Sequence, residues 1–174
     1  MKVIQRFRGI LCRGTIGKLY NLISFSKYMK VTRKYYRKQG VNLTKPNYIH
    51  PTVYIDSHNY GLISIGDGTT ISMNVVLLCH DYSITNALKA SGYIPTKGFP
   101  HFEKEISIGN NCFIGANAML LPGTVLGDNC IVGAGAIVKG KYPDNCIIVG
   151  NPAKVIANTI EWTKKKQQLK DWGT

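Results

Sequence analysis

His80 is the residue of this 174-residue sequence that is best placed for acid–base chemistry. It ends a run of regularly spaced aliphatic residues and stands directly before a polar stretch, 82–105, that breaks the spacing. We expect a histidine at such a junction to be half shielded from water. An imidazole titrates near neutrality, so it can act as a general base. A polar residue at a loop junction can also have no catalytic role.

The C-terminal half of the sequence repeats with a period of six residues. From residue 108 it reads IGNNCF, IGANAM, LLPGTV, LGDNCI, VGAGAI and VKGKYP. The branched aliphatics that open the six blocks are Ile108, Ile114, Leu120, Leu126, Val132 and Val138. The small residues at the fifth position are Cys112, Ala118, Thr124, Cys130 and Ala136. This period predicts a solenoid, in which three hexads make a triangular coil of about 18 residues.

The sequence also repeats at the expected coil length. When residues 108–125 are aligned with residues 126–143, Gly109 meets Gly127 and Asn111 meets Asn129. We expect the aliphatic residues to fill the narrow core of the prism. We expect the glycines and asparagines to lie at corners that need a positive φ. Ordinary buried strands have no reason to repeat every six residues.

This pattern resembles that of the hexapeptide-repeat acyltransferase superfamily, whose members fold as left-handed parallel β-helices. The resemblance covers about Val41 to Ile156. It implies a mainly β protein with a basic helical segment at 1–40 and a β-helix domain at 41–157. That domain extrudes the loop 82–105, and a helix at 158–174 follows it. The handedness comes from the resemblance, and it is an exception to the usual right-handed crossover.

Residues 1–39 lack the hexads and carry apolar residues at helical spacing. Gly14 and Gly17 interrupt this spacing, so we expect two short helices, the second of which ends at Gly40. After residue 138 the hexads are interrupted again before the segment IIVGNPAKVI, which we expect to close the last coil.

The resemblance also implies catalytic roles. In the sugar and antibiotic O-acetyltransferases of the superfamily, the catalytic histidine precedes a loop that leads to a segment like ISIGNNCFIG, here residues 106–115. His80 would then take the proton from a substrate hydroxyl as its oxygen attacks the acetyl-CoA thioester. The family position that donates a backbone N–H to the oxyanion corresponds to Ala116. Phe113, where the family often has Trp, and Tyr82 in the loop are candidates for substrate contact.

The segment VGNPAKVI, residues 149–156, resembles the closing signature of the superfamily. The resemblance implies that Lys154 lies near the phosphates of CoA and that Lys139 lies beside the pantetheine groove. The backbone of Ala134 would contact the pantetheine arm. CoA is polyanionic, so lysines are expected at its groove. Solvated surface lysines are the alternative interpretation of both positions.

The other histidines and the cysteines predict no metal site. His50 and His58 lie in the irregular first coils, and His101 lies in the loop, where we expect a surface histidine that could contact substrate. The related γ-class carbonic anhydrases need three histidines, and the H-x4-H pair among them does not occur here. The odd number of cysteines is not typical of a disulfide framework. We expect Cys112 and Cys130 to be buried thiols one coil apart, at a separation that could permit a disulfide.

The chain is basic, with a formal net charge of +13. Residues 1–40 hold eleven Lys or Arg, and no Asp or Glu occurs before Asp56. Because we find neither a spanning apolar run nor a signal pattern, we expect a cytoplasmic protein that is attracted to the anionic inner face of a membrane. A solvated helix face is the alternative. No nucleic-acid-binding motif is present, so nucleic acid is not an expected partner.

These features predict an acetyl-CoA-dependent O-acetyltransferase that acts on a carbohydrate hydroxyl in surface polysaccharide biosynthesis, without a metal. The family implies a homotrimer with one site at each subunit interface. One alternative is an N-acetyltransferase for a nucleotide-linked amino sugar. Another is a serine acetyltransferase, although the long helical N-terminal domain of that family is missing here. An inert β-helix that serves for binding or assembly is disfavoured by His80 and the closing signature. The group that orients His80 is not evident from the sequence.

Overall fold

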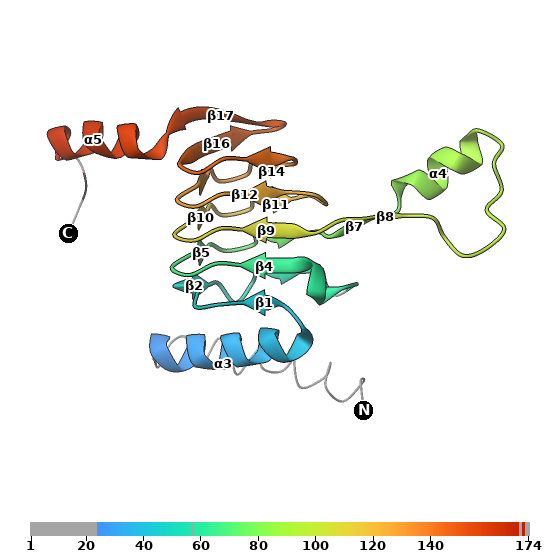
Figure 1. Cartoon of the computed structure of the whole chain (residues 1–174), viewed down its shortest axis with the longest axis horizontal. Helices are drawn as coiled ribbons and strands as arrows, with labels where there is room; N and C mark the ends of the chain where they lie inside the picture. The colour runs from blue at the N-terminus through green and yellow to red at the C-terminus, as the bar shows by residue number, and fades with distance from the viewer. Residues whose placement is uncertain (1–23, 57, 171, 173–174) are drawn as a thin grey trace.

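The computed structural model describes residues 24–56, 58–170 and 172, and the body of the protein is a triangular parallel β-helix (Figure 1). Short coils stack from the helix α3 at the lower end to a β-hairpin at the upper end. Two segments project sideways from this body in opposite directions. They are the arm, residues 82–105, and the helix α5, Thr159–Leu169 (Figure 1).

Three sheets form the faces of the prism. The five-stranded face, ordered β1-β4-β9-β12-β15, consists of Asn42–Leu43, Ile63–Ile65, Ile106–Ile108, Val125–Leu126 and Lys141–Tyr142. The six-stranded face, ordered β17-β16-β13-β10-β5-β2, consists of Ala153–Asn158, Cys146–Gly150, Ile131–Val132, Phe113–Ile114, Thr70–Ile71 and Tyr48–Ile49. The four-stranded face, ordered β14-β11-β6-β3, consists of Ile137–Val138, Met119–Leu120, Val76–Leu77 and Tyr54–Ile55.

The aliphatic residue that opens each hexad points into the core and stacks on its counterpart in the next coil. Ile114 pairs with Val132, which confirms the predicted spacing of 18 residues. All six of these aliphatics are at most 2% exposed, and the small residues at the fifth positions are equally buried. Burial of each of these branched side chains stabilises the fold by about 1.5–3 kcal/mol relative to leaving it exposed. Each of these hexads contributes one such side chain to the core.

The corners follow the sequence prediction only in part. Asparagines do adopt a positive φ, with 51° at Asn111 and 58° at Asn129. The hexad glycine Gly115 does not, and the expectation of a positive φ there was wrong. A Cβ at Gly115 would lie 2.5 Å from the backbone nitrogen of Ala134 in the coil above. Glycine is therefore needed at this position because adjacent coils approach closely, and not because of its backbone conformation.

The coils at the lower end are longer than those above. Tyr48 pairs with Thr70 and Tyr54 pairs with Val76, which is a spacing of 22 residues. This extra length includes the short 3₁₀ turn η2, Tyr60–Leu62. It explains why the hexads are hard to follow near the start of the β-helix.

The helix α3, Phe25–Gln39, closes the lower end of the prism. The side chain of Ser24 caps its first turn, and Gly40 ends it with a φ of 105°, as the sequence predicted. The inner face of α3 packs against the first coil, and the hydroxyl of Tyr28 donates a hydrogen bond to the carbonyl of Ile49. The other helix expected in the N-terminal segment lies in residues 1–23, outside the described residues.

Two expectations about the remaining segments were right only in part. The arm is not without regular structure, because it contains the helix α4, Ser83–Ala90, and its return strand β8, Phe102–Glu103, pairs antiparallel with β7, His80–Asp81. The closing segment completes the last coil with its first half, because β16 pairs parallel with β13. The second half then turns back, so that β16 and β17 form an antiparallel hairpin that leads into α5. No helix within the described ranges is both long enough and apolar enough to cross a bilayer.

The cysteines that the structure describes are all buried free thiols, namely Cys79, Cys112, Cys130 and Cys146. The prediction of two buried thiols one coil apart is confirmed for Cys112 and Cys130. Their sulfur atoms donate to backbone carbonyls, at 3.2 Å to Gly127 and 3.3 Å to Pro143. The alternative, a disulfide between them, is not formed.

Candidate active site

His80 lies at the edge between the four-stranded and five-stranded faces, at the root of the arm. It follows β6 by three residues and opens β7, where it faces Glu103 of the return strand. The imidazole is 23% exposed, so it is shielded on one side and accessible on the other, as expected at such a junction.

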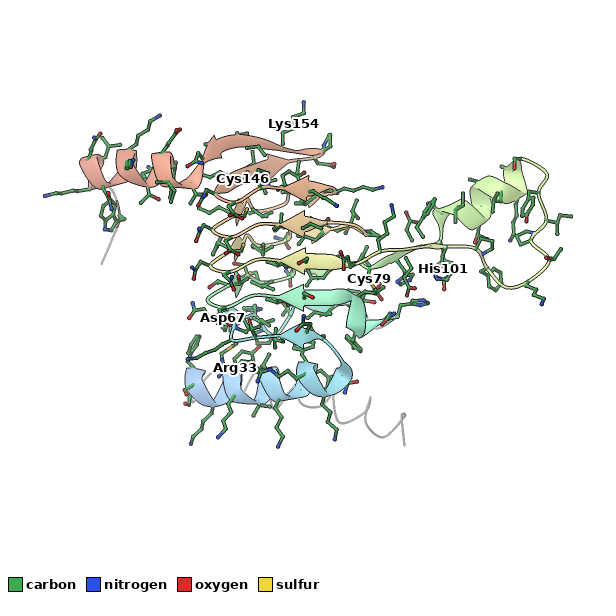
Figure 2. The ribbon with its side chains drawn as sticks, viewed as in Figure 1. Arg33, Asp67, Cys79, His101, Cys146 and Lys154 are labelled. Carbon is green, nitrogen blue, oxygen red and sulfur yellow. The ribbon has the colours of Figure 1, made fainter. Side chains whose placement is uncertain are left out.

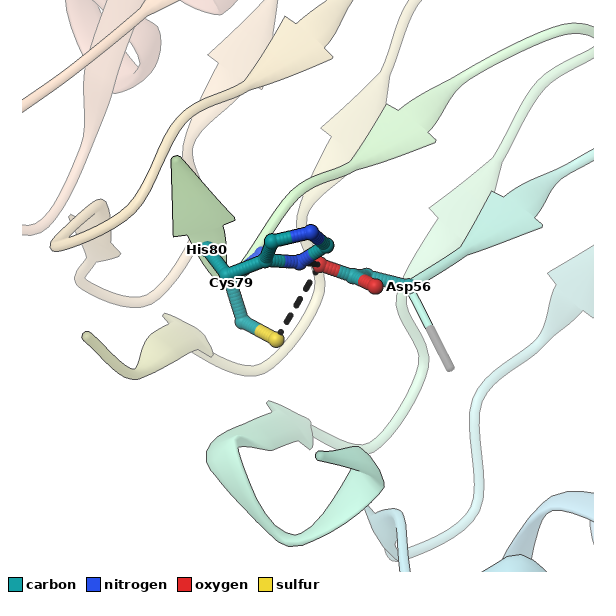
Figure 3. A group of neighbouring side chains, drawn as sticks. All are labelled: Asp56, Cys79 and His80. Atoms are coloured by element: carbon teal, nitrogen blue, oxygen red, sulfur yellow. Dashed lines mark hydrogen bonds and ion pairs between the residues drawn. The ribbon is translucent and has the colours of Figure 1, made fainter. Parts of the chain in front are cut away.

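Asp56 orients the imidazole of His80 (Figure 3). Its Oδ2 is hydrogen-bonded to Nδ1 of His80, and its side chain is only 2% exposed. Asp56 follows β3 in the coil below, and its backbone N–H donates to the carbonyl of Leu77 at 3.0 Å. The pairing of β3 with β6 therefore places this carboxylate beside His80.

The hydrogen bonds that Asp56 accepts determine its charge. Burial raises the pKa of this carboxyl, but the bonds from the backbone N–H of His58, from the His80 ring and from Cys79 outweigh burial and hold its pKa below the ordinary value. An ionised carboxylate can only accept hydrogen bonds. Nδ1 of His80 is therefore the donor, and Nε2 of the neutral ring carries the free lone pair.

Cys79 is a hydrogen-bond donor at this site. Its thiol donates to Oδ2 of Asp56 at 3.3 Å (Figure 3). Burial and the bond to Asp56 raise the pKa of Cys79 to about 11. Because the thiolate is the nucleophilic form of cysteine, this protonated thiol is not a nucleophile at neutral pH.

A cluster of aromatic rings surrounds His80 on the side of the arm. The ring of His58 stacks on His80, with centroids 4.6 Å apart and planes at 28°, and the ring of Tyr82 lies 5.2 Å away on edge. His101, near the root of the arm in Figure 2, lies 4.8 Å from Tyr82 and 5.1 Å from His58. The sequence pattern did not reveal that His58 and His101 accompany His80, because the three residues lie in separate segments.

A cavity of about 220 Å³ opens beside His80. Its other lining residues are Leu78, Asp81, Phe102, Lys104, Leu121, Pro122 and Lys139. A second cavity of about 410 Å³ shares Lys104, Pro122 and Lys139 with it and continues along the same edge of the prism. The structure thus places Lys139 and His80 on one continuous groove.

The other residues that the sequence singled out lie elsewhere on the single chain. Ala116 and Ala134 lie in consecutive coils at the edge between the six-stranded and four-stranded faces, and Phe113 is exposed on the six-stranded face. Lys154 is exposed on β17 at the upper end (Figure 2). The four-stranded face separates Ala116 from His80. One side of the prism is about five extended residues wide. At about 3.3 Å per residue, Ala116 and His80 are therefore separated by on the order of 15 Å.

A family model described as "Hexapeptide repeat of succinyl-transferase" matches residues 105–139. The matched segment begins at the end of the arm and includes the strands from β9 to β14. It therefore covers the coils directly above His80 and the groove residue Lys139.

Three known proteins illustrate the similarity of this sequence to other chains. The chain is 40% identical over 124 residues to Protein CapG of Staphylococcus aureus, which covers 68% of this chain and 67% of CapG. It is 34% identical over 166 residues to a Dictyostelium discoideum protein assigned as an acetyltransferase, with 84% of each chain covered. It is 29% identical over 116 residues to WbbJ of Escherichia coli K12, assigned as an O-acetyl transferase of lipopolysaccharide biosynthesis, with 64% of this chain and 58% of WbbJ covered.

The fold is similar to that of a solved galactoside acetyltransferase in complex with coenzyme A. The two structures have a TM-score of 0.52 at 22% identity, and the similarity covers 90% of this chain and 85% of the other. The repeat, the parallel β-helix and the relatives together show that the chain belongs to the hexapeptide-repeat acyltransferase superfamily and is an acetyltransferase.

Proposed function

We propose that the protein transfers the acetyl group of acetyl-CoA to a hydroxyl of a carbohydrate, in the biosynthesis of a surface polysaccharide. The observation that carries this proposal is the Asp56–His80 pair, which faces a groove at the root of the arm. A buried carboxylate that holds one nitrogen of a half-exposed imidazole leaves the other nitrogen free to accept a proton.

The proposed reaction uses His80 as the general base. Nε2 of His80 takes the proton of the acceptor hydroxyl as the hydroxyl oxygen attacks the thioester carbonyl. Asp56 stabilises the positive charge that forms on the ring. When the tetrahedral intermediate collapses, the carbon–sulfur bond breaks, and the CoA sulfur takes the proton from His80. The products are the acetyl ester and free CoA, and the imidazole returns to its neutral form.

The groove offers positive charge for the phosphates of CoA. Lys104 and Lys139 line it beside His80, and Lys141 lines its continuation. Phosphate groups prefer such charge-assisted contacts. By resemblance to the family, we assign Lys139 and the backbone of Ala134 to the pantetheine arm, and Lys154 to the phosphates.

A homotrimer would complete the site. In a single chain, Ala116 lies across the four-stranded face from His80, so its backbone N–H cannot serve as the oxyanion donor there. In a threefold assembly the Ala116 edge of one subunit can meet the His80 edge of its neighbour. Phe113 on the adjacent face would then provide an apolar wall for the substrate.

The acceptor is assigned as a carbohydrate on two grounds. WbbJ, one of the relatives, is assigned to lipopolysaccharide biosynthesis as an O-acetyl transferase. The root of the arm also presents exposed aromatic rings beside the groove, Tyr82 at 41% and Phe102 at 47% exposure. Aromatic faces combine apolar surface with polar tips and suit sugar rings.

The proposed location is the cytoplasmic face of a membrane. The outer face of α3 carries four exposed lysines, Lys27, Lys30, Lys34 and Lys38, at spacings that place them on one side of the helix. A row of lysines without acidic residues suits an anionic lipid surface. A solvated helix face is the competing explanation, and vesicle binding distinguishes the two.

The test is an acetyl-transfer assay with the purified protein. Acetyl-CoA is supplied with neutral sugars, nucleotide-linked sugars, amino sugars and polysaccharide fragments, and free CoA is measured with a thiol reagent. Mass spectrometry then identifies the acetylated product. We expect an ester on a sugar hydroxyl, and we expect transfer by His80→Ala to be lower by on the order of 10²–10⁴-fold. Acetylation of amines alone would instead support an N-acetyltransferase, and CoA release with no acceptor in the panel would contradict the proposed acceptor class.

A further inference from the structure

We propose that His58, His101 and Glu103 form a binding site for a divalent transition-metal ion, with Zn²⁺ as the best fit, at the root of the arm. One ligand atom of each side chain lies within 4.8 Å of those of the other two. Nε2 of His58 lies 3.5 Å from Oε1 of Glu103. The site extends beyond the proposed transfer reaction, which needs no metal.

The donor set fits this class of ion. Two imidazole nitrogens and one carboxylate oxygen are ligands that Zn²⁺ takes at about 2.0–2.2 Å, with a fourth position left for water. Hard ions such as Mg²⁺ and Ca²⁺ prefer oxygen ligands and would not select two histidines. All three side chains are exposed, so modest rotations can bring their donor atoms to bonding distance without disturbing the core.

A second observation concerns the orientation of His101. Its Nδ1 is hydrogen-bonded to the carbonyl of Phe99 at 3.1 Å. A carbonyl can only accept, so Nδ1 is the donor and Nε2 carries the lone pair. Metal-binding histidines usually have their second nitrogen held in this way by a carbonyl or carboxylate. The ring of His101 is thus already in the tautomer that a metal ion requires.

The ligands come from segments that are far apart in the sequence. His58 lies between β3 and η2 in the lower coils, whereas His101 and Glu103 lie on the return segment of the arm. A bound ion would therefore tie the arm to the body of the β-helix. This explains why the sequence spacing predicted no metal site, since no two of the ligands form a short-range motif beyond the H-x-E of residues 101–103.

The proposed ion would lie next to the candidate base, because the ring of His58 stacks on His80 with centroids 4.6 Å apart. Metal binding itself does not rest on the proposed function.

Binding is tested by calorimetric titration of the full-length protein with ZnCl₂ and by absorption spectroscopy with CoCl₂. We expect one site in the wild type. His58→Ala and His101→Ala should each weaken it by more than about tenfold, the lower limit seen when even an outer partner of a ligand is removed. Glu103→Gln is a milder third variant. The cobalt spectrum should lack sulfur-to-metal charge transfer.

His50→Ala and Cys79→Ala are the matched controls, and both should retain the site. Cys79 matters because it forms a second possible donor group with Asp56 and His80. Undiminished binding in both His58→Ala and His101→Ala, or binding lost in Cys79→Ala alone, would overturn the proposal. So would no binding of either metal by the wild type.

Discussion

The carboxylate of Asp56 holds Nδ1 of His80 from the coil below. The backbones on either side of this contact are joined by the ladder between β3 and β6, in which the N–H of Asp56 donates to the carbonyl of Leu77. The pair is thus positioned by the rigid β-helix. The arm begins only after His80, so a change in the arm can alter access to the imidazole while the bond to Asp56 stays in place.

His80→Ala should lower acetyl transfer by on the order of 10²–10⁴-fold, the usual contribution of a general base, and should leave CoA binding intact. Asp56→Asn should lower the rate by less, because the base remains and only its orientation and charge stabilisation change. The double variant should be no slower than His80→Ala, since both residues act through one imidazole. Steady-state kinetics measures the rates and calorimetry measures CoA affinity. Additive losses in the double variant would show that Asp56 acts independently of His80.

The stability of the protein should depend on the ionisation of Asp56. Its pKa is lowered in the folded state, so its contribution to stability is complete above the pKa of an unfolded aspartate and is lost as pH falls through the lower folded value. Between about pH 5 and pH 3, a range that includes the pKa of an unfolded aspartate, the wild type should lose more unfolding free energy than Asp56→Asn. Urea denaturation at a series of pH values measures this difference. Parallel curves for the two proteins would contradict it.

Lys139→Ala and Lys154→Ala should raise the KM for acetyl-CoA and leave kcat nearly unchanged. Contacts of Lys139 with the pantetheine arm and of Lys154 with the phosphates are the same in the ground state and the transition state, so their loss weakens binding alone. Lys139 lines the groove beside His80, whereas Lys154 lies on β17 at the upper end, so we expect the larger effect from Lys139. Lys164→Ala on α5 is the control, with an exposed lysine outside the groove. A fall in kcat alone would show that Lys139 contributes to the chemical step.

The protein should sediment as a trimer, with three times the 19.3 kDa mass of the chain. The physical reason is the position of Ala116, which can approach a His80 only on a neighbouring subunit. Analytical ultracentrifugation at micromolar concentration measures the mass. An active monomer would show that the oxyanion donor belongs to the same chain as His80 and is not Ala116.

The protein should bind anionic vesicles and should not bind neutral ones at low salt. The four exposed lysines of α3 provide the attraction. It should be lost at high salt, because the Debye length falls from about 10 Å at 0.1 M to about 3 Å at 1 M. Co-sedimentation measures binding, and reversal of the four lysines to glutamate should abolish it. Reversal of Lys164, Lys165 and Lys166 on α5 is the matched control. Equal binding to both vesicle types, or to neither, would reject the membrane association.

The hexads were sufficient to predict the prism because each block supplies its own core residue. Ile114, for example, needs only a partner 18 residues later, and Val132 is that partner. The arm was not predictable in the same way. The helix at residues 83–90 begins soon after His80, where the hexads stop. The broken period indicated only that the chain leaves the β-helix there, and it did not indicate which structure the arm adopts.

Asp56 shows why the candidate site was predicted only in part. His80 could be identified from its place before the arm, but Asp56 lies 24 residues earlier, out of register with an 18-residue coil. Only the 22-residue spacing of the lower coils brings Asp56 level with residue 78, next to Cys79 and His80. A single acidic residue after a core strand is the one signal in the sequence that could have indicated it.

The hairpin of β16 and β17 has a consequence for solubility. A parallel β-helix that simply stopped would expose a row of unpaired N–H and C=O groups, which could template the addition of further chains into a fibre. Here the six-stranded face ends in a reversed strand that carries the exposed Lys154, while the other two faces stop one level lower at β14 and β15. At the opposite end, α3 and its lysines cover the first coil. The lower end and the upper edge of the six-stranded face are therefore protected against end-to-end addition of a further chain.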